Sequence, residues 1–188
     1  MSPGEKKNWD AALLERVARH EAGHAYICWK GGETPSYLTV VARSNFGGYM
    51  RHGDQEGKEL FTRDELRAKI RTSLAGRAAE IVYYGDDEGV STGAAGDFES
   101  ATSLAIRMIC SYGMDETFGL ASVDAQSARM GEASSEVRRA VNGILAEEMQ
   151  TAIALIREGR PVIDRLVELL MEKNHLTGPE MEAVFRGI

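Results

Sequence analysis

The stretch His20-Glu21-Ala22-Gly23-His24 places two histidines four residues apart, with a glutamate directly after the first. On an α-helix each residue advances about 100°, so the imidazoles lie about 40° apart and Glu21 lies about 100° from His20. The three side chains therefore share one helix face. Two imidazoles one turn apart can hold a single zinc ion while the carboxylate reaches a water molecule beside it. The motif predicts a zinc hydrolase with His20 and His24 as ligands and Glu21 as general base.

The residues around the motif predict the helix that this geometry needs. It should run from residue 8 or 10 to residue 29, with a capping residue at its start and Gly31-Gly32 after its end. An alternative is that both histidines are ordinary surface or core residues. An H-E-x-x-H string arises by chance on the order of once per 10⁴ to 10⁵ positions, because histidine is scarce. The helical setting therefore favours the metal site.

Composition excludes several other classes of function. With 22 basic and 29 acidic residues, the net charge of -7 argues against a nucleic-acid surface. No window approaches the roughly 18 apolar residues of a membrane span, and the N-terminus lacks the apolar core of a signal peptide. The chain is expected to be cytoplasmic and to form one domain over residues 1–188. Cys28 and Cys110 form no C-x-x-C pattern and are expected to be reduced core residues.

Apolar spacing elsewhere predicts a mainly α fold with a small β hairpin beside the active-site cleft. Residues 37–43 and 46–50 are expected to form two short paired strands. The expected helices follow a capping box at Thr62, cover residues 96–113 and 134–158, begin again near Pro161, and follow a second capping box at Thr177. Within the single domain, the first helix and cleft should occupy residues 8–130 and a C-terminal helical bundle residues 134–188.

A catalytic zinc needs a third protein ligand, and several side chains compete for this role. Cys28 lies two turns from His20, about 12 Å along the helix, so it cannot share the ion and is expected to pack in the core. His52 and His175 lie in polar segments and are expected to be exposed histidines.

Two carboxylates on predicted helices remain as candidates, and spacing alone does not choose between them. Glu80 could instead form a solvated salt bridge with Arg77. Asp97 could be an ordinary acidic residue at a helix N-terminus, where the helix dipole favours it.

Several separated blocks, in the same order, resemble the peptidase domain of FtsH-type, membrane-anchored, ATP-dependent zinc proteases. The resemblance extends from about residue 13 to residue 185. Besides the opening motif, the blocks are Gly76-Arg77-Ala78-Ala79-Glu80, Thr92-Gly93-Ala94, Asp97, Ala101-Thr102, Arg107-Met108 and Tyr112-Gly113-Met114.

The resemblance implies a complete site and a way of binding substrate. It implies His20, His24 and Asp97 as zinc ligands, Glu21 as base, and Glu80 as the acceptor that orients a ligand histidine. Residues 37–50 would offer a strand edge to unfolded proteins or peptides, although a plain structural lid is the alternative. A partner AAA-type ATPase, in cis or in trans, and a hexameric ring are implied by the same family.

The chain also departs from the family pattern. No G-x-x-x-x-G-K-[ST] string is present, because Gly57-Lys58 is followed by Glu59, so this is expected to be either an excised domain or a stand-alone relative. Ala75 stands where the family usually has a second glycine, and residues 47–61 form a short, unusual segment.

The resulting hypothesis is a zinc metalloendopeptidase that cleaves unfolded proteins or peptides, with ATP-dependent activity if a motor is supplied. One rival is a zinc-stabilised, non-catalytic module that binds peptides or a partner. Another is a metal-free helical scaffold.

Overall fold

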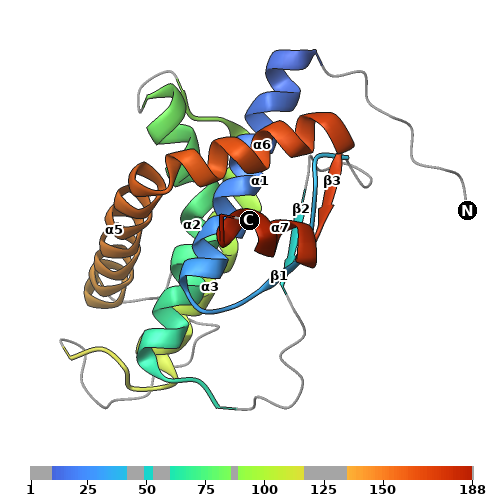
Figure 1. Cartoon of the computed structure of the whole chain (residues 1–188). Helices are drawn as coiled ribbons and strands as arrows, with labels where there is room; N and C mark the ends of the chain where they lie inside the picture. Colours follow the sequence, from blue (N-terminus) through green and yellow to red (C-terminus); the bar gives the residue numbers. More distant parts are fainter. Residues whose placement is uncertain (1–9, 42–48, 53–59, 86–88, 117–134, 188) are drawn as a thin grey trace, which may run out of the picture.

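The computed structural model describes residues 10–41, 49–52, 60–85, 89–116 and 135–187 (Figure 1). Its helices are α1 (Ala11–Lys30), α2 (Arg63–Tyr84), α3 (Ala95–Cys110), α5 (Ser135–Glu158), α6 (Arg160–Lys173) and α7 (Gly178–Phe185), with a 3₁₀ turn η1 (Thr92–Ala94) before α3. The strands are β1 (Pro35–Thr39), β2 (Tyr49–His52) and β3 (His175–Thr177). The predicted mainly α class is confirmed. Among the described residues, no helix has the length and apolar character that crossing a bilayer requires.

Local capping explains why the helix boundaries lie within a few residues of those predicted. The Asp10 carboxylate accepts a hydrogen bond from the Leu13 amide at 2.7 Å and so begins α1. At α2, the Thr62 hydroxyl accepts from the Glu65 amide at 3.3 Å, and the Glu65 carboxylate accepts from the Thr62 amide at 2.9 Å. The same reciprocal pair begins α7 at Thr177. Both predicted capping boxes are confirmed.

The sheet differs from the predicted hairpin in its bounds and in its number of strands. Its order is β2-β1-β3 and both pairings are antiparallel, with Leu38 opposite Leu176 in the β1–β3 pair. The expected first strand, 37–43, ends at Thr39. The expected second strand, 46–50, is corrected to 49–52, although residues 42–48 lie outside the described residues. The strand β3 was not expected, because three residues carry too little pattern and pairing with β1 creates it.

Two apolar cores lie on different sides of α2. One joins α1 and the sheet to α5, α6 and α7, and the other joins α2 and α3 to α5. In Figure 1 the sheet lies beside α7, and α5 lies at the left, across α1 and α2 from the sheet. The helices after residue 134 therefore complete cores that the earlier helices begin.

The contact between α1 and α2 is unusually close. A Cβ atom built on Gly23 would lie 2.9 Å from the Cβ of Ala79 and 3.0 Å from the backbone oxygen of Ala75. Both alanines are fully buried. A glycine on α1 facing alanines on α2 thus lets the two helix backbones approach, and Ala75 is accommodated in this contact.

We predict opposite effects for two Gly→Ala substitutions within helices. Gly143→Ala lies on the exposed face of α5 with no atom within 4 Å of the new Cβ, so higher helix propensity should stabilise the protein by about 0.5–1 kcal/mol. Gly23→Ala gains the same propensity but overpacks the α1–α2 contact and should destabilise by about 1–3 kcal/mol. Urea denaturation measures both. A Gly23→Ala variant as stable as Gly143→Ala would contradict the close-contact argument.

Candidate metal centre

The two motif histidines are buried on α1 and held from behind by acceptors on α2. The Nδ1 atom of His24 donates to the carbonyl oxygen of Thr72 at 2.7 Å. The Nδ1 atom of His20 lies 3.4 Å from Oε1 of Glu80. Each Nδ1 therefore faces an acceptor, which favours the tautomer with its proton on Nδ1. With the proton on Nδ1, a neutral imidazole keeps the lone pair of its Nε2 atom for a metal ion.

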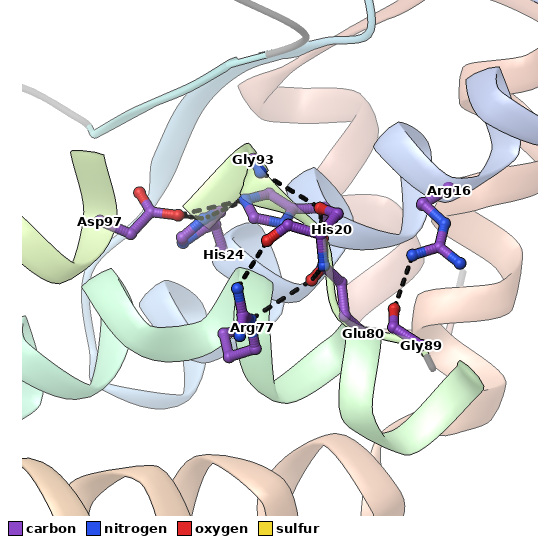
Figure 2. A network of polar contacts seen from close by, with 9 residues as sticks. Arg16, His20, His24, Arg77, Glu80, Gly89, Gly93 and Asp97 are labelled. Carbon is purple, nitrogen blue, oxygen red and sulfur yellow. Dashed lines mark hydrogen bonds and ion pairs between the residues drawn. The ribbon is translucent and has the colours of Figure 1, made fainter. Parts of the chain in front are cut away.

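Asp97, in the first turn of α3, completes a triangle with these nitrogens (Figure 2). Its Oδ2 atom lies 3.1 Å from Nε2 of His20 and 3.2 Å from Nε2 of His24, and the two Nε2 atoms are 3.2 Å apart. Ligands at about 2.0–2.1 Å from a tetrahedral zinc are separated by about 3.3 Å. Three lone-pair donors at this spacing repel one another unless a proton or a metal ion lies between them. The residues present therefore fit a zinc ion.

The other proposed ligands lie elsewhere. Among the described residues, only His20, His24 and Asp97 gather into a group with metal-ligand spacing. Cys28 is buried in the core, as expected, and His175 is exposed on β3, where its ring stacks on Tyr37. The side chain of His52 lies outside the described residues.

Glu80 is a buried carboxylate behind His20, so the alternative prediction that it lies on a solvated helix face is wrong. Its side chain is 2% exposed, although Arg77 Nε does lie 3.3 Å from its Oε2 atom. The amide of Ser91 donates to Oε2 at 2.9 Å, and the Ser91 hydroxyl donates to Oε1 at 2.5 Å. Burial alone would raise the pKa of Glu80, but the hydrogen bonds from His20 and Ser91 outweigh it and lower this pKa to about 2. Glu80 therefore stays ionised.

The carboxylates of Glu21, Glu80 and Asp97 all lie close enough to His20 to affect its pKa. Burial opposes a charged His20, yet its contacts with Asp97 and Glu80 raise its pKa to about 10. Burial likewise opposes ionisation of Asp97, but hydrogen bonds with His20 and His24 hold the pKa of this carboxyl well below its usual range. Carboxylates beside the two imidazoles also favour a divalent cation, because opposite charges attract.

Glu21 differs from the other two acids in its surroundings. Its side chain is buried, and no described residue hydrogen-bonds to its carboxylate. Burial raises the pKa of Glu21, while His24 and His20 act in the opposite direction. A carboxyl group with a raised pKa and no hydrogen-bond partner among the described residues is suited to accept and return a proton.

Sequence reasoning missed the parts of the site that hold the histidines in place. A Cβ atom on Gly76 would lie 2.2 Å from Nε2 of His20, so this glycine makes room for the imidazole itself. The run of small residues around Gly76 signalled only a close helix contact. The roles of the Thr72 carbonyl and of Ser91 had no sequence signal, because backbone acceptors and a lone serine form no pattern.

Two histidines and a glutamate on one helix, closed by a carboxylate from another, form the arrangement of the H-E-x-x-H class of metallohydrolase centres. Residues 9–184 match the model of peptidase family M41, and the chain belongs to this family. The predicted resemblance to the FtsH-type peptidase domain is thereby confirmed.

Similar proteins carry names that agree with this family. The chain is 34% identical over 186 residues to the ATP-dependent zinc metalloprotease FtsH 1 of Thermoanaerobacter sp. (strain X514), covering 91% of this chain and 30% of that protein. It is 34% identical over 184 residues to FtsH of Thermotoga maritima (89% and 30%) and 33% identical over 184 residues to the chloroplastic FTSH 6 of Arabidopsis thaliana (89% and 26%). The chain thus spans less than a third of the length of these relatives.

We predict that Gly76→Ala disrupts the metal centre while the nearby Gly96→Ala does not. The new methyl group at position 76 overlaps the His20 ring, whereas no atom lies within 4 Å of one at position 96, beside Asp97. Zinc affinity of Gly76→Ala should fall by at least about 100-fold, because a displaced ligand does more damage than the loss of a supporting contact. Competition with a chromophoric chelator measures this affinity, and circular dichroism checks folding. Equal affinity of the two variants would contradict the predicted role of Gly76.

Proposed function

We propose that this chain is a zinc-dependent endopeptidase domain that hydrolyses peptide bonds in unfolded proteins or peptides. The observation that carries the proposal is the triangle of His20, His24 and Asp97 (Figure 2), with the buried side chain of Glu21 on the same helix face as the two histidines. Membership in peptidase family M41 supports peptide hydrolysis, and the names of the relatives support zinc.

Each residue has a specific part in the proposed reaction. His20, His24 and Asp97 would hold a zinc ion, which supplies Lewis acidity to a water molecule and to the substrate carbonyl. Glu21 takes the proton of the attacking water and later returns it to the leaving amine. Glu80 and the Thr72 carbonyl keep the two imidazoles in the tautomer that directs Nε2 toward the metal.

The sheet offers a surface on which an extended substrate could bind. The strand β1 is paired on both sides, so the edge expected within residues 37–50 reduces to β2, which pairs only with β1 among the described residues. We propose that substrate adds as a strand along β2, where main-chain hydrogen bonds tolerate many sequences. A structural lid is the alternative for this hairpin.

An ATPase would determine which proteins reach this site. The relatives are named as ATP-dependent, and the chain covers only a part of each. We propose that an AAA-type ATPase, in cis or in trans, supplies unfolded chains, with a hexamer as the proposed assembly. The 188-residue chain by itself should then cleave casein or short peptides and leave stably folded proteins intact.

We predict that Glu21→Gln separates zinc binding from catalysis. The amide has nearly the same shape but cannot accept the proton, so cleavage of fluorescent casein should fall by about 10²- to 10⁴-fold. Zinc content, measured by elemental analysis, should stay near one ion per chain. The control is Glu172→Gln on the exposed face of α6, which should keep both properties.

Retained cleavage by pure Glu21→Gln protein would exclude Glu21 as the base. An unmodified chain that binds zinc and cleaves nothing would instead support the non-catalytic binding module.

We also predict that removing the metal destabilises the fold. Zinc binding to the native state alone adds about 2.7 kcal/mol to stability when free zinc is 100 times Kd. A chelator should therefore lower Tm, and added Zn²⁺ should restore it. Mg²⁺ should not restore it, because it prefers six oxygen ligands. An unchanged Tm together with no bound zinc would support the metal-free scaffold.

A further inference from the structure

The histidines lie on α1 and Asp97 lies on α3, and Arg77 of α2 contacts both the carboxylate that faces His20 and the segment that leads to Asp97 (Figure 2). Its Nη2 atom donates to the carbonyl oxygen of Ser91 at 2.6 Å, and its Nε atom lies 3.3 Å from Oε2 of Glu80. Its guanidinium group lies 5.2 Å from the ring centroid of Phe98, the residue after Asp97. One planar group thus contacts the carboxylate behind His20, the residue before η1, and the first turn of α3.

Ser91 makes the second connection, because its hydroxyl both donates and accepts a hydrogen bond. The Oγ atom accepts from the Gly93 amide at 3.2 Å and donates to Oε1 of Glu80 at 2.5 Å, while its own amide donates to Oε2 at 2.9 Å. Because the hydroxyl has one proton and this proton goes to Glu80, Ser91 fixes the carboxylate in one orientation. The same residue is the N-cap of η1, which leads directly into α3 and Asp97.

We propose that Arg77 and Ser91 are positioning residues of the metal centre, which lock the Asp97 segment to the carboxylate that orients His20. This proposal rests on the metal site of the proposed function. His20 and Asp97 are 77 residues apart, and a metal site requires its ligands to be held within about 0.5 Å of the productive geometry. Through Glu80 on one side and η1–α3 on the other, Arg77 and Ser91 define the distance between Nε2 of His20 and Oδ2 of Asp97.

The residue types present suit this role. Arginine carries a planar fork of donors and stacks on aromatic rings, so it can contact Ser91, Glu80 and Phe98 together. Lysine keeps the charge but offers a single compact donor group that cannot make all three contacts. A purely structural tie would change the stability of the protein and leave the metal affinity of the folded chain unaltered.

The experiment compares Ser91→Ala and Arg77→Lys with Ser91→Thr, which keeps the hydroxyl, and with Ser100→Ala, an exposed serine on α3. Zinc Kd is measured by chelator competition, and the visible spectrum of the Co²⁺-substituted protein reports ligand geometry. We expect Kd to rise by about 10- to 100-fold in Ser91→Ala and Arg77→Lys, with an altered Co²⁺ spectrum. Both control variants should keep the Kd and the spectrum of the unmodified chain.

A lower Tm with unchanged zinc Kd and Co²⁺ spectrum in both test variants would overturn the proposal, as would failure of Ser91→Thr to retain affinity. If Ser91→Ala does not fold, the zinc Kd and the Co²⁺ spectrum of Arg77→Lys test the proposal instead. An unmodified chain that binds zinc but cleaves nothing overturns the proposed function alone, and the Kd comparison still decides the positioning role. An unmodified chain that binds no zinc overturns both the proposed function and the positioning role.

Discussion

The close packing of α1 against α2 is the constraint on which the rest of the site depends. Gly23 lets the helices approach at Ala75 and Ala79, and Gly76 leaves the space that the His20 ring occupies. Only at this separation can His24 reach the Thr72 carbonyl and His20 face Glu80. Main-chain and side-chain acceptors on α2 then direct both imidazoles toward α3. The glycines thus shape the candidate metal centre by letting two helices pack closely.

The charges of the site are consistent with this packing. Glu80 is ionised although almost no water reaches it, because Ser91 and His20 donate hydrogen bonds to its two oxygens and the Arg77 guanidinium lies beside one of them. A buried carboxylate without such donors would take up a proton. Glu21, buried without these partners, has a raised pKa. Two glutamates in one centre therefore differ in proton affinity because of their neighbours, and the difference matches their proposed roles.

Local patterns predicted most of the fold. The capping boxes at Thr62 and Thr177 and the cap at Asp10 involve residues three positions apart, so their pattern can be recognised in the sequence without knowing the fold. The strand β3 escaped prediction because its three residues adopt an extended form only through pairing with β1, more than 130 residues away in sequence. The positions of β1 and β2 were shifted for the same reason, since pairing determines where a short strand ends.

Part of the candidate site could likewise be predicted from local sequence, and part depended on the tertiary structure. The sequence by itself determined that His20, Glu21 and His24 share a helix face, because the α-helix repeat alone relates residues one turn apart. From the residues alone it left Glu80 and Asp97 as equal candidates for the third ligand, and only the resemblance to a known family favoured Asp97. The tertiary structure decided which carboxylate meets the Nε2 atoms and which lies behind His20. That choice depends on how α1, α2 and α3 pack, and no local rule relates residues that are 60 or 77 positions apart.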